Sequence, residues 1–176
     1  MDIRARQAPL RDRYEHDPGS AIQRLHVEGG RADLADPLHC DIGPTQMPEV
    51  VWHSGAHAAV GGGGDVPCSG DLLLGALAAC QEITLRMVAA NMGIEITDLR
   101  IDVEADWDAR GTLAMGREFP VGIRAIRCRT TVTIAEDVNG ERAERLLRSA
   151  ERYCVVLDTL RTGVEVDATI DVRRAA

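Results

Sequence analysis

The pattern of apolar and polar positions along the chain predicts a single α+β domain. Apolar residues alternate with charged ones over 99–107 and again over 126–134, which is typical of strands with one buried and one exposed face. A third alternating run over 164–172 predicts a last strand, and two or three short strands are expected within 21–52. Because the order is strands, helix, two strands, helix and strand, the pattern favours antiparallel sheets with helices on one face.

The longest apolar segment predicts a central helix over 72–92. Ser69 is a suitable N-cap, Asp71 lies in the first turn, where a carboxylate favours the helix dipole, and Gly93 is a suitable C-terminal stop. The first half of this helix is apolar on every side, so it has to be buried all round. One chain of this size buries such a helix poorly, and a second subunit is therefore expected. A shorter helix is expected after Asn139, with 155–161 as its extension or as a new helix that ends at Gly163.

Composition narrows the classes of function. The chain has 176 residues and a net charge of −8, which argues against nucleic acid or an anionic membrane as a partner. Residues 1–19 are polar and rich in Arg, so they predict a flexible N-terminal arm before a single domain over 20–176. The apolar run at 72–80 is too short to span a membrane, and no signal peptide is evident, so a cytoplasmic protein is expected.

The five cysteines are the main candidates for chemistry. In a reducing cytoplasm they are core thiols, metal ligands or reactive thiols rather than a disulfide framework. From the residues alone, Cys80 in the central helix and Cys154 after Tyr153 are read as core thiols, and a reactive Cys80 would need a nearby cation to lower its pKa. Cys128 is expected in the core, while Cys68, at the start of the central helix, is a possible second reactive thiol.

Two cysteine-bearing stretches resemble one known family. The stretch GDLLLGALAACQEITLRM at 70–87 resembles the central-helix motif of the OsmC/Ohr family, the osmotically inducible protein C-like and organic hydroperoxide resistance-like thiol peroxidases. The stretch AERYCVVLDTL at 150–160 resembles that family's second cysteine motif, and the resemblance spans about 61–172. It implies an OsmC-like fold, with antiparallel sheets packed on long buried central helices, and an intertwined homodimer with active sites at the subunit interface.

The resemblance also implies a reaction. Cys80 would attack an organic hydroperoxide or hydrogen peroxide and become a sulfenic acid, Cys154 would condense with it to a disulfide, and an external dithiol would reduce that disulfide. No metal or cofactor is implied. An Arg from the N-terminal strands would hold the thiolate; Arg31 is preferred here and Arg24 is the alternative. Asp71 stands where the family has a longer acid that holds this Arg.

Two departures from the family pattern keep other functions open. Val155 stands where the family often has Pro, and Glu82 would raise the pKa of the thiol if it faced it. The alternative is therefore a non-catalytic dimeric module that binds a small apolar or thiol-bearing ligand, with both cysteines in its core. A third hypothesis is a metal-binding protein or hydrolase, because two histidines at H-x3-H spacing precede a cysteine, namely His53, His57 and Cys68.

Overall fold

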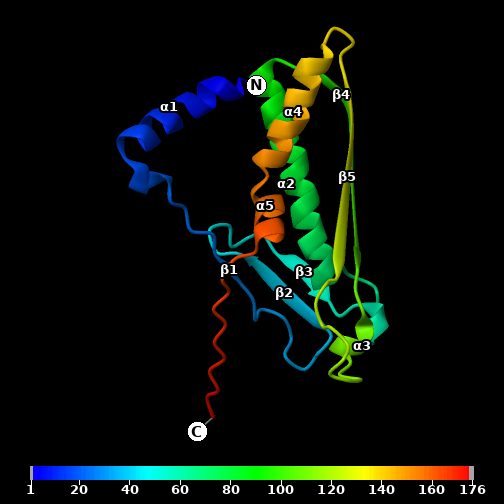
Figure 1. Cartoon of the computed structure of the whole chain (residues 1–176). Coiled ribbons are helices and arrows are strands. Elements are labelled where there is room, and N and C mark those ends of the chain that lie inside the picture. The colour runs from blue at the N-terminus through cyan, green and yellow to red at the C-terminus, as the bar shows by residue number, and fades with distance from the viewer. Residues whose placement is uncertain (1, 175–176) are drawn as a thin grey trace.

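The molecule is built around one long helix, α2 (Ser69–Met92), in a computed structural model that describes residues 2–174. An antiparallel ribbon of β4 (Ile96–Asp106) and β5 (Ala125–Ile134) runs along one side of this helix. Two further helices, α4 (Gly140–Arg152) and α5 (Val155–Thr162), pack against α2 as well, as Figure 1 shows. The predicted mixed α+β architecture, with antiparallel sheets and long helices, is thus confirmed.

Local sequence explains where α2 begins and ends. Its N-cap is Cys68, one residue before the predicted cap, and the Asp71 carboxylate accepts a hydrogen bond from the Cys68 backbone N–H at 2.8 Å. This hydrogen bond satisfies the Cys68 N–H, which the start of the helix would otherwise leave unpaired. Gly93 ends the helix in the left-handed region at φ 64°, where a residue without Cβ is favoured.

The ribbon and α4 bury one face of α2. The β4–β5 register pairs Val103 with Cys128, and alternate residues of both strands are less exposed than their neighbours. The core is a cluster of apolar side chains from α2, the α2–β4 connection and α4, namely Leu85, Ala89, Ile94, Leu146 and Ala150. This arrangement places the middle of α2, including Cys80, between the ribbon and α5.

The N-terminal part forms a small separate sheet. It contains β1 (Val27–Glu28), β2 (His39–Pro44) and β3 (Trp52–Gly55), paired antiparallel in the order β1-β2-β3. The sequence predicted two or three short strands within 21–52, and three form, although the last of them begins only at Trp52. The short elements that remain are two 3-10 turns and a one-turn helix in the β4–β5 connection, at Pro18–Ala21, Ala58–Val60 and α3 (Ala109–Thr112).

The N-terminal segment contains a helix where the sequence predicted a loose arm. Helix α1 (Ile3–His16) begins at an Asp2 N-cap and has no buried residue among those described. It carries no apolar stripe, so hydrophobic periodicity could not reveal it. Two polar contacts join it to α2: Arg4 donates to the Asn91 carbonyl oxygen, and the Asn91 amide donates to Gln7 at 3.1 Å.

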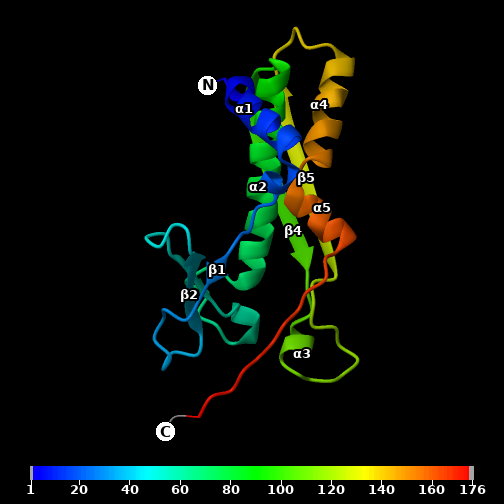
Figure 2. The same cartoon turned by 90° about the vertical axis from the view of Figure 1, so that its left-hand side faces the viewer.

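The predicted last strand does not form within the described chain. Residues 163–174 are extended but have no strand partner, and they run away from the ribbon, as Figure 2 shows. The apolar side chains of this segment are exposed, with Ile170 at 90%. A strand needs the hydrogen-bonding edge of a neighbour, and alternation in the sequence does not say whether that edge belongs to the same chain.

Helix α2 also keeps an uncovered face. Its buried side chains are Leu77, Gln81, Leu85 and Ala89, while Ile83 on another face is 55% exposed. By length and composition α2 could cross a membrane, but the central helix of a globular protein meets the same criterion. The expectation that α2 is buried on every side is therefore not met by one chain alone.

Candidate functional site

The fold brings the two cysteines of the sequence motifs together. Cys80 lies in the middle of α2, and Cys154 is the N-cap residue of α5, where it is 0% exposed. The Cys154 thiol lies beside the Cys80 sulfur and acts on it as a hydrogen-bond donor that lowers the Cys80 pKa. The Thr84 hydroxyl, one helical turn beyond Cys80, lies 4.0 Å from the same sulfur. The site is therefore a half-buried dithiol, reduced in this structure, in which the Cys154 thiol helps to lower the pKa of the Cys80 thiol.

The two thiols differ in acidity. Burial raises the pKa of Cys80, but hydrogen bonds from the Val156 N–H, the Cys154 thiol and the Thr84 hydroxyl outweigh it and bring this pKa below its ordinary value. Burial also raises the pKa of Cys154, and the neighbouring Cys80 sulfur adds to this rise, so that the pKa is about 11. Because the thiolate is the nucleophilic form, this difference in pKa favours Cys80 over Cys154 as the nucleophile.

The donors to Cys80 come from the start of α5. The first N–H groups of a helix have no partner within the helix, and those of Val155 and Val156 are directed to the Cys80 sulfur. Sequence reasoning missed these donors, although one signal was present: Val155 keeps an N–H that the Pro common in the family would lack. The departure at this position therefore adds a hydrogen-bond donor beside the thiol.

The other departure, Glu82, has a separate partner. Its carboxylate accepts a hydrogen bond from Arg86 at 2.9 Å on an exposed part of α2. The acid next to the thiol is thus engaged elsewhere in this chain.

The structure does not bring Arg31 and Asp71 to the dithiol. Arg31 donates to Glu28 at 2.5 Å and to the Pro48 carbonyl oxygen at 3.3 Å, in the small N-terminal sheet. The Asp71 carboxylate caps α2, and the N–H of Cys68 lowers its pKa. Within residues 2–174, no hydrogen bond or ion pair joins Arg31 or the alternative Arg24 to Asp71 or to Cys80. Their predicted roles stay predictions.

The residues of the metal hypothesis are engaged in other contacts. His53 Nδ1 lies 2.7 Å from an Asp41 carboxylate oxygen, while His57 accepts a hydrogen bond from the Ala59 N–H and its ring packs edge-on against Trp107. Throughout the described part of the chain, no three or more His, Cys, Asp or Glu side chains are placed to hold a metal ion. The geometry thus lends no support to a metal centre on His53, His57 and Cys68.

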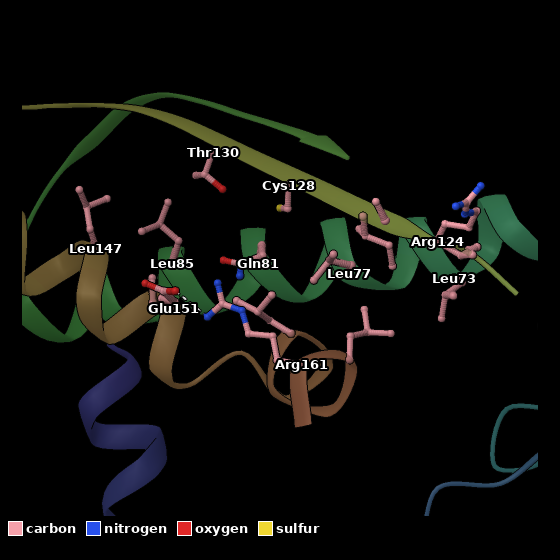
Figure 3. A pocket seen from close by; sticks show the side chains of 16 residues that line it. Leu73, Leu77, Gln81, Leu85, Arg124, Cys128, Thr130, Leu147, Glu151 and Arg161 are labelled. Carbon is pink, nitrogen blue, oxygen red and sulfur yellow. Dashed lines mark hydrogen bonds and ion pairs between the residues drawn. The ribbon is translucent and has the colours of Figure 1, made fainter. Parts of the chain in front are cut away.

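A cavity of about 830 Å³ with a mixed polar and apolar lining lies between α2, β5, α4 and α5. Figure 3 shows Gln81, which is 8% exposed, pointing into it opposite Cys128 and Thr130 of β5. The Arg161–Glu151 ion pair, at 2.6 Å, lies on the helical side. Burial raises the pKa of Cys128, so this thiol is less acidic than an ordinary one. Neither Cys80 nor Cys154 is among the described residues that line this cavity.

Fold and site together define an α+β dithiol protein, in which a thiol of lowered pKa on a central helix contacts a second thiol at the start of another helix. The family model described as "OsmC-like protein" matches residues 62–169. This is more than half of the chain, and the chain therefore belongs to the OsmC-like family, as its sequence motifs predicted. A search of curated protein sequences gives no match.

Solved structures agree with this family assignment at the level of the fold. An OsmC-like protein from Mycoplasma pneumoniae is 14% identical with a TM-score of 0.60, and the match covers 80% of this chain and 89% of that one. An OsmC-like protein of unknown function from Vibrio cholerae is 8% identical with a TM-score of 0.62, over 78% and 94%. An organic hydroperoxide resistance protein from Legionella pneumophila is 17% identical with a TM-score of 0.52, over 80% and 90%.

Proposed function

We propose that the protein is a thiol-dependent peroxidase that reduces organic hydroperoxides or hydrogen peroxide. The observation that carries the proposal is the contact between Cys80, whose pKa is lowered, and Cys154, whose pKa is raised. A nucleophilic thiol beside a second thiol of the same chain is what a disulfide-forming peroxidase needs. Membership of a family with solved structures named organic hydroperoxide resistance proteins supports the same reaction.

The reaction follows from these two sulfurs. The Cys80 thiolate attacks the terminal peroxide oxygen, the O–O bond breaks, and the alcohol leaves with a proton while Cys80 becomes a sulfenic acid. The Cys154 sulfur then attacks the Cys80 sulfur, water leaves, and a disulfide forms. An external dithiol reduces this disulfide by exchange and is itself oxidised to a disulfide. No cofactor takes part in these steps.

Oxidation of Cys80 also changes the surroundings of Cys154. In the reduced pair, burial and the Cys80 sulfur keep the pKa of Cys154 at about 11, so this thiol stays protonated at neutral pH. Once Cys80 carries an oxygen and no longer a negative charge, the electrostatic part of this effect disappears. Oxidation of Cys80 should therefore make Cys154 more acidic than in the reduced pair, although burial, the larger cause of its raised pKa, remains.

A homodimer belongs to the same proposal. The uncovered face of α2 and the extended segment after α5 leave large apolar side chains in water, including Ile83, Val166 and Ile170. Large apolar side chains left in water on a central helix and on an unpaired extended segment indicate surfaces that a partner covers. A second copy of the chain would cover the face of α2 and give the extended segment a strand partner. Light scattering of the 19.0 kDa chain at micromolar concentration should give twice that mass, and a monomer would contradict the dimer.

The remaining predictions about the site fit this assembly. The ion pair of Arg31 with Glu28 is exposed, so it is easily exchanged, and the N-terminal sheet that carries it makes few contacts with α2 of its own chain. We therefore keep Arg31, with Asp71 as its partner acid, as the residue that would hold the Cys80 thiolate in the dimer. We likewise propose that the protein acts in the cytoplasm, where a dithiol reductant is at hand.

Peptide mapping after one equivalent of cumene hydroperoxide tests the reaction. The reduced protein should lose two hydrogens at a bridge between Cys80 and Cys154 and release one equivalent of alcohol. Cys154→Ser should instead stop at a Cys80 sulfenic acid that dimedone traps, whereas Cys80→Ser should leave the peroxide intact. Cys128→Ser is the matched control and should behave as the wild type, because Cys128 lines the cavity of about 830 Å³, which neither Cys80 nor Cys154 lines.

The alternative function predicts a different result in the same experiment. If both cysteines serve only as core residues of a ligand-binding module, the peroxide stays intact and the two thiols stay reduced. That outcome, with the protein still folded, would contradict the peroxidase.

A further inference from the structure

A second cavity, of about 950 Å³, lies between α1, α2 and α4. Figure 2 shows α1 lying across α2 beside α4, and side chains of all three helices line the space. Helix α1 lies outside the residues that match the family model, 62–169. One wall of this cavity is therefore not part of the region that defines the family.

The cavity carries an excess of positive charge. Arg4 and Arg11 line it from α1 and Arg145 lines it from α4, and none of the described lining residues is acidic. This contrasts with the net charge of −8 of the whole chain. Three guanidinium groups without a carboxylate among them form a local site for an anion.

These charges are not neutralised by other contacts. Arg4 donates to the backbone carbonyl oxygen of Asn91, and Arg11 donates to the amide oxygen of Gln7 at 3.2 Å; both acceptors are uncharged. Arg145 has no hydrogen-bond or ion-pair partner among residues 2–174. Arg148, one turn further along α4, is instead paired with Glu144 at 3.1 Å and does not line the cavity.

Part of the remaining wall is apolar, beside uncharged polar residues such as Thr84 and Ser149. Ala8 of α1 and Met87, Val88 and Met92 of α2 face the same space as the arginines. An inorganic anion would leave this wall uncovered, and a neutral apolar molecule would leave the guanidinium groups unused. We propose that the cavity binds an organic carboxylate with an apolar tail, whose carboxylate pairs with Arg145 and Arg11 while its tail lies on Met87 and Val88.

The cavity adjoins the dithiol. Thr84 lines it, and the Thr84 hydroxyl lies 4.0 Å from the Cys80 sulfur. Tyr153, the residue before Cys154, lines it as well. A hydroperoxide that carries a carboxylate would therefore be held with its chain next to the reactive thiol. This consequence for substrate choice rests on the proposed peroxidase, whereas binding of the carboxylate does not.

Calorimetric titration with dodecanoate, below its micelle concentration, tests the binding. Dodecanol, which has the same chain without a charge, is the matched ligand. Dodecanoate should bind more tightly than dodecanol, and Arg145→Gln should weaken dodecanoate about tenfold without affecting dodecanol, because it removes one charge-assisted hydrogen bond. Arg148→Gln, with the same loss of charge on the same helix, should leave both affinities unchanged. Ala8→Trp, which fills the cavity, should abolish both.

The proposal is overturned if dodecanoate does not bind, if the two ligands bind equally well, or if Arg148→Gln weakens dodecanoate as much as Arg145→Gln does. A kinetic comparison then tests substrate choice. The KM for a fatty acid hydroperoxide should be lower than that for its methyl ester, and Arg145→Gln should remove most of this difference with little change in kcat. An Arg145-dependent affinity for dodecanoate in a protein that consumes no peroxide would keep the binding site and refute the peroxidase.

Discussion

Replacing Val155 by Pro isolates the effect of the α5 backbone on the reactive thiol. Val155 is the first residue of α5, a position where Pro is well tolerated because the N–H has no partner within the helix. Cys154 before it has φ −79° and ψ 101°, which suits a residue that precedes Pro, and the Val155 side chain is 69% exposed. Val155→Pro should therefore remove one hydrogen bond to Cys80 and leave the helix intact.

The size of the effect follows from the hydrogen bond that is lost. A hydrogen bond to a charged group contributes about 1.5–3 kcal/mol. The lower value, about 1.5 kcal/mol, is the appropriate one for Val155, because several donors share the Cys80 sulfur. This corresponds to about tenfold less thiolate at any pH below the Cys80 pKa of both proteins. A more basic thiolate is also a better nucleophile, which recovers part of the rate, so alkylation in that pH range should slow only about three- to fourfold.

The same reasoning predicts that the two pH profiles cross. Above the pKa of both proteins the thiolate is fully formed, and the more basic thiolate of Val155→Pro should react about threefold faster than that of the wild type. Pulses of iodoacetamide between pH 6 and 11, followed by peptide mass spectrometry at Cys80, measure both regimes. Val155→Ala keeps the N–H and should follow the wild type. Superimposed profiles of Val155→Pro and Val155→Ala, in folded proteins, would refute the role of this N–H.

Two further predictions concern stability. Leu85→Ala, in the core at 1% exposure, should lower the free energy of unfolding by about 2–5 kcal/mol in urea titrations. Ile83→Ala, on the uncovered face of α2, should weaken dimerisation far more than it destabilises the fold of a single chain. Equal losses of fold stability in the two variants would contradict this assignment of core and surface. Asp36 and then Asp65 raise the pKa of His39, so the ion pairs of His39 should stabilise the fold below about pH 6.5. This stabilisation should be lost as the pH rises through the raised pKa. His39→Gln should therefore have a lower urea midpoint than the wild type at pH 5.5, but the same midpoint at pH 9.

The core of the fold could be predicted because it follows hydrophobic periodicity. The central helix was placed within three residues at its start and matched at its end, since the cap at Cys68 and the stop at Gly93 are local signals. The paired strands were found because alternation marks a ribbon with one covered face. Helix α1 and the extended segment after Gly163 were misjudged, because the first has no apolar face and the second lacks a neighbour in its own chain.

The site could be predicted only in part, for a related reason. Neither cysteine carries a signal in its own surroundings, and their contact became predictable only through the two family motifs. The motifs say nothing about backbone donors, because an N–H group leaves no mark in a sequence except where Pro removes it. Val155 is an example. As a departure from the family pattern it suggested a loss of catalytic function, whereas in the structure its N–H is a hydrogen-bond donor to Cys80 that Pro could not supply. A substitution beside a reactive group therefore has to be judged by the main-chain groups it exposes as well as by the side chain it exchanges.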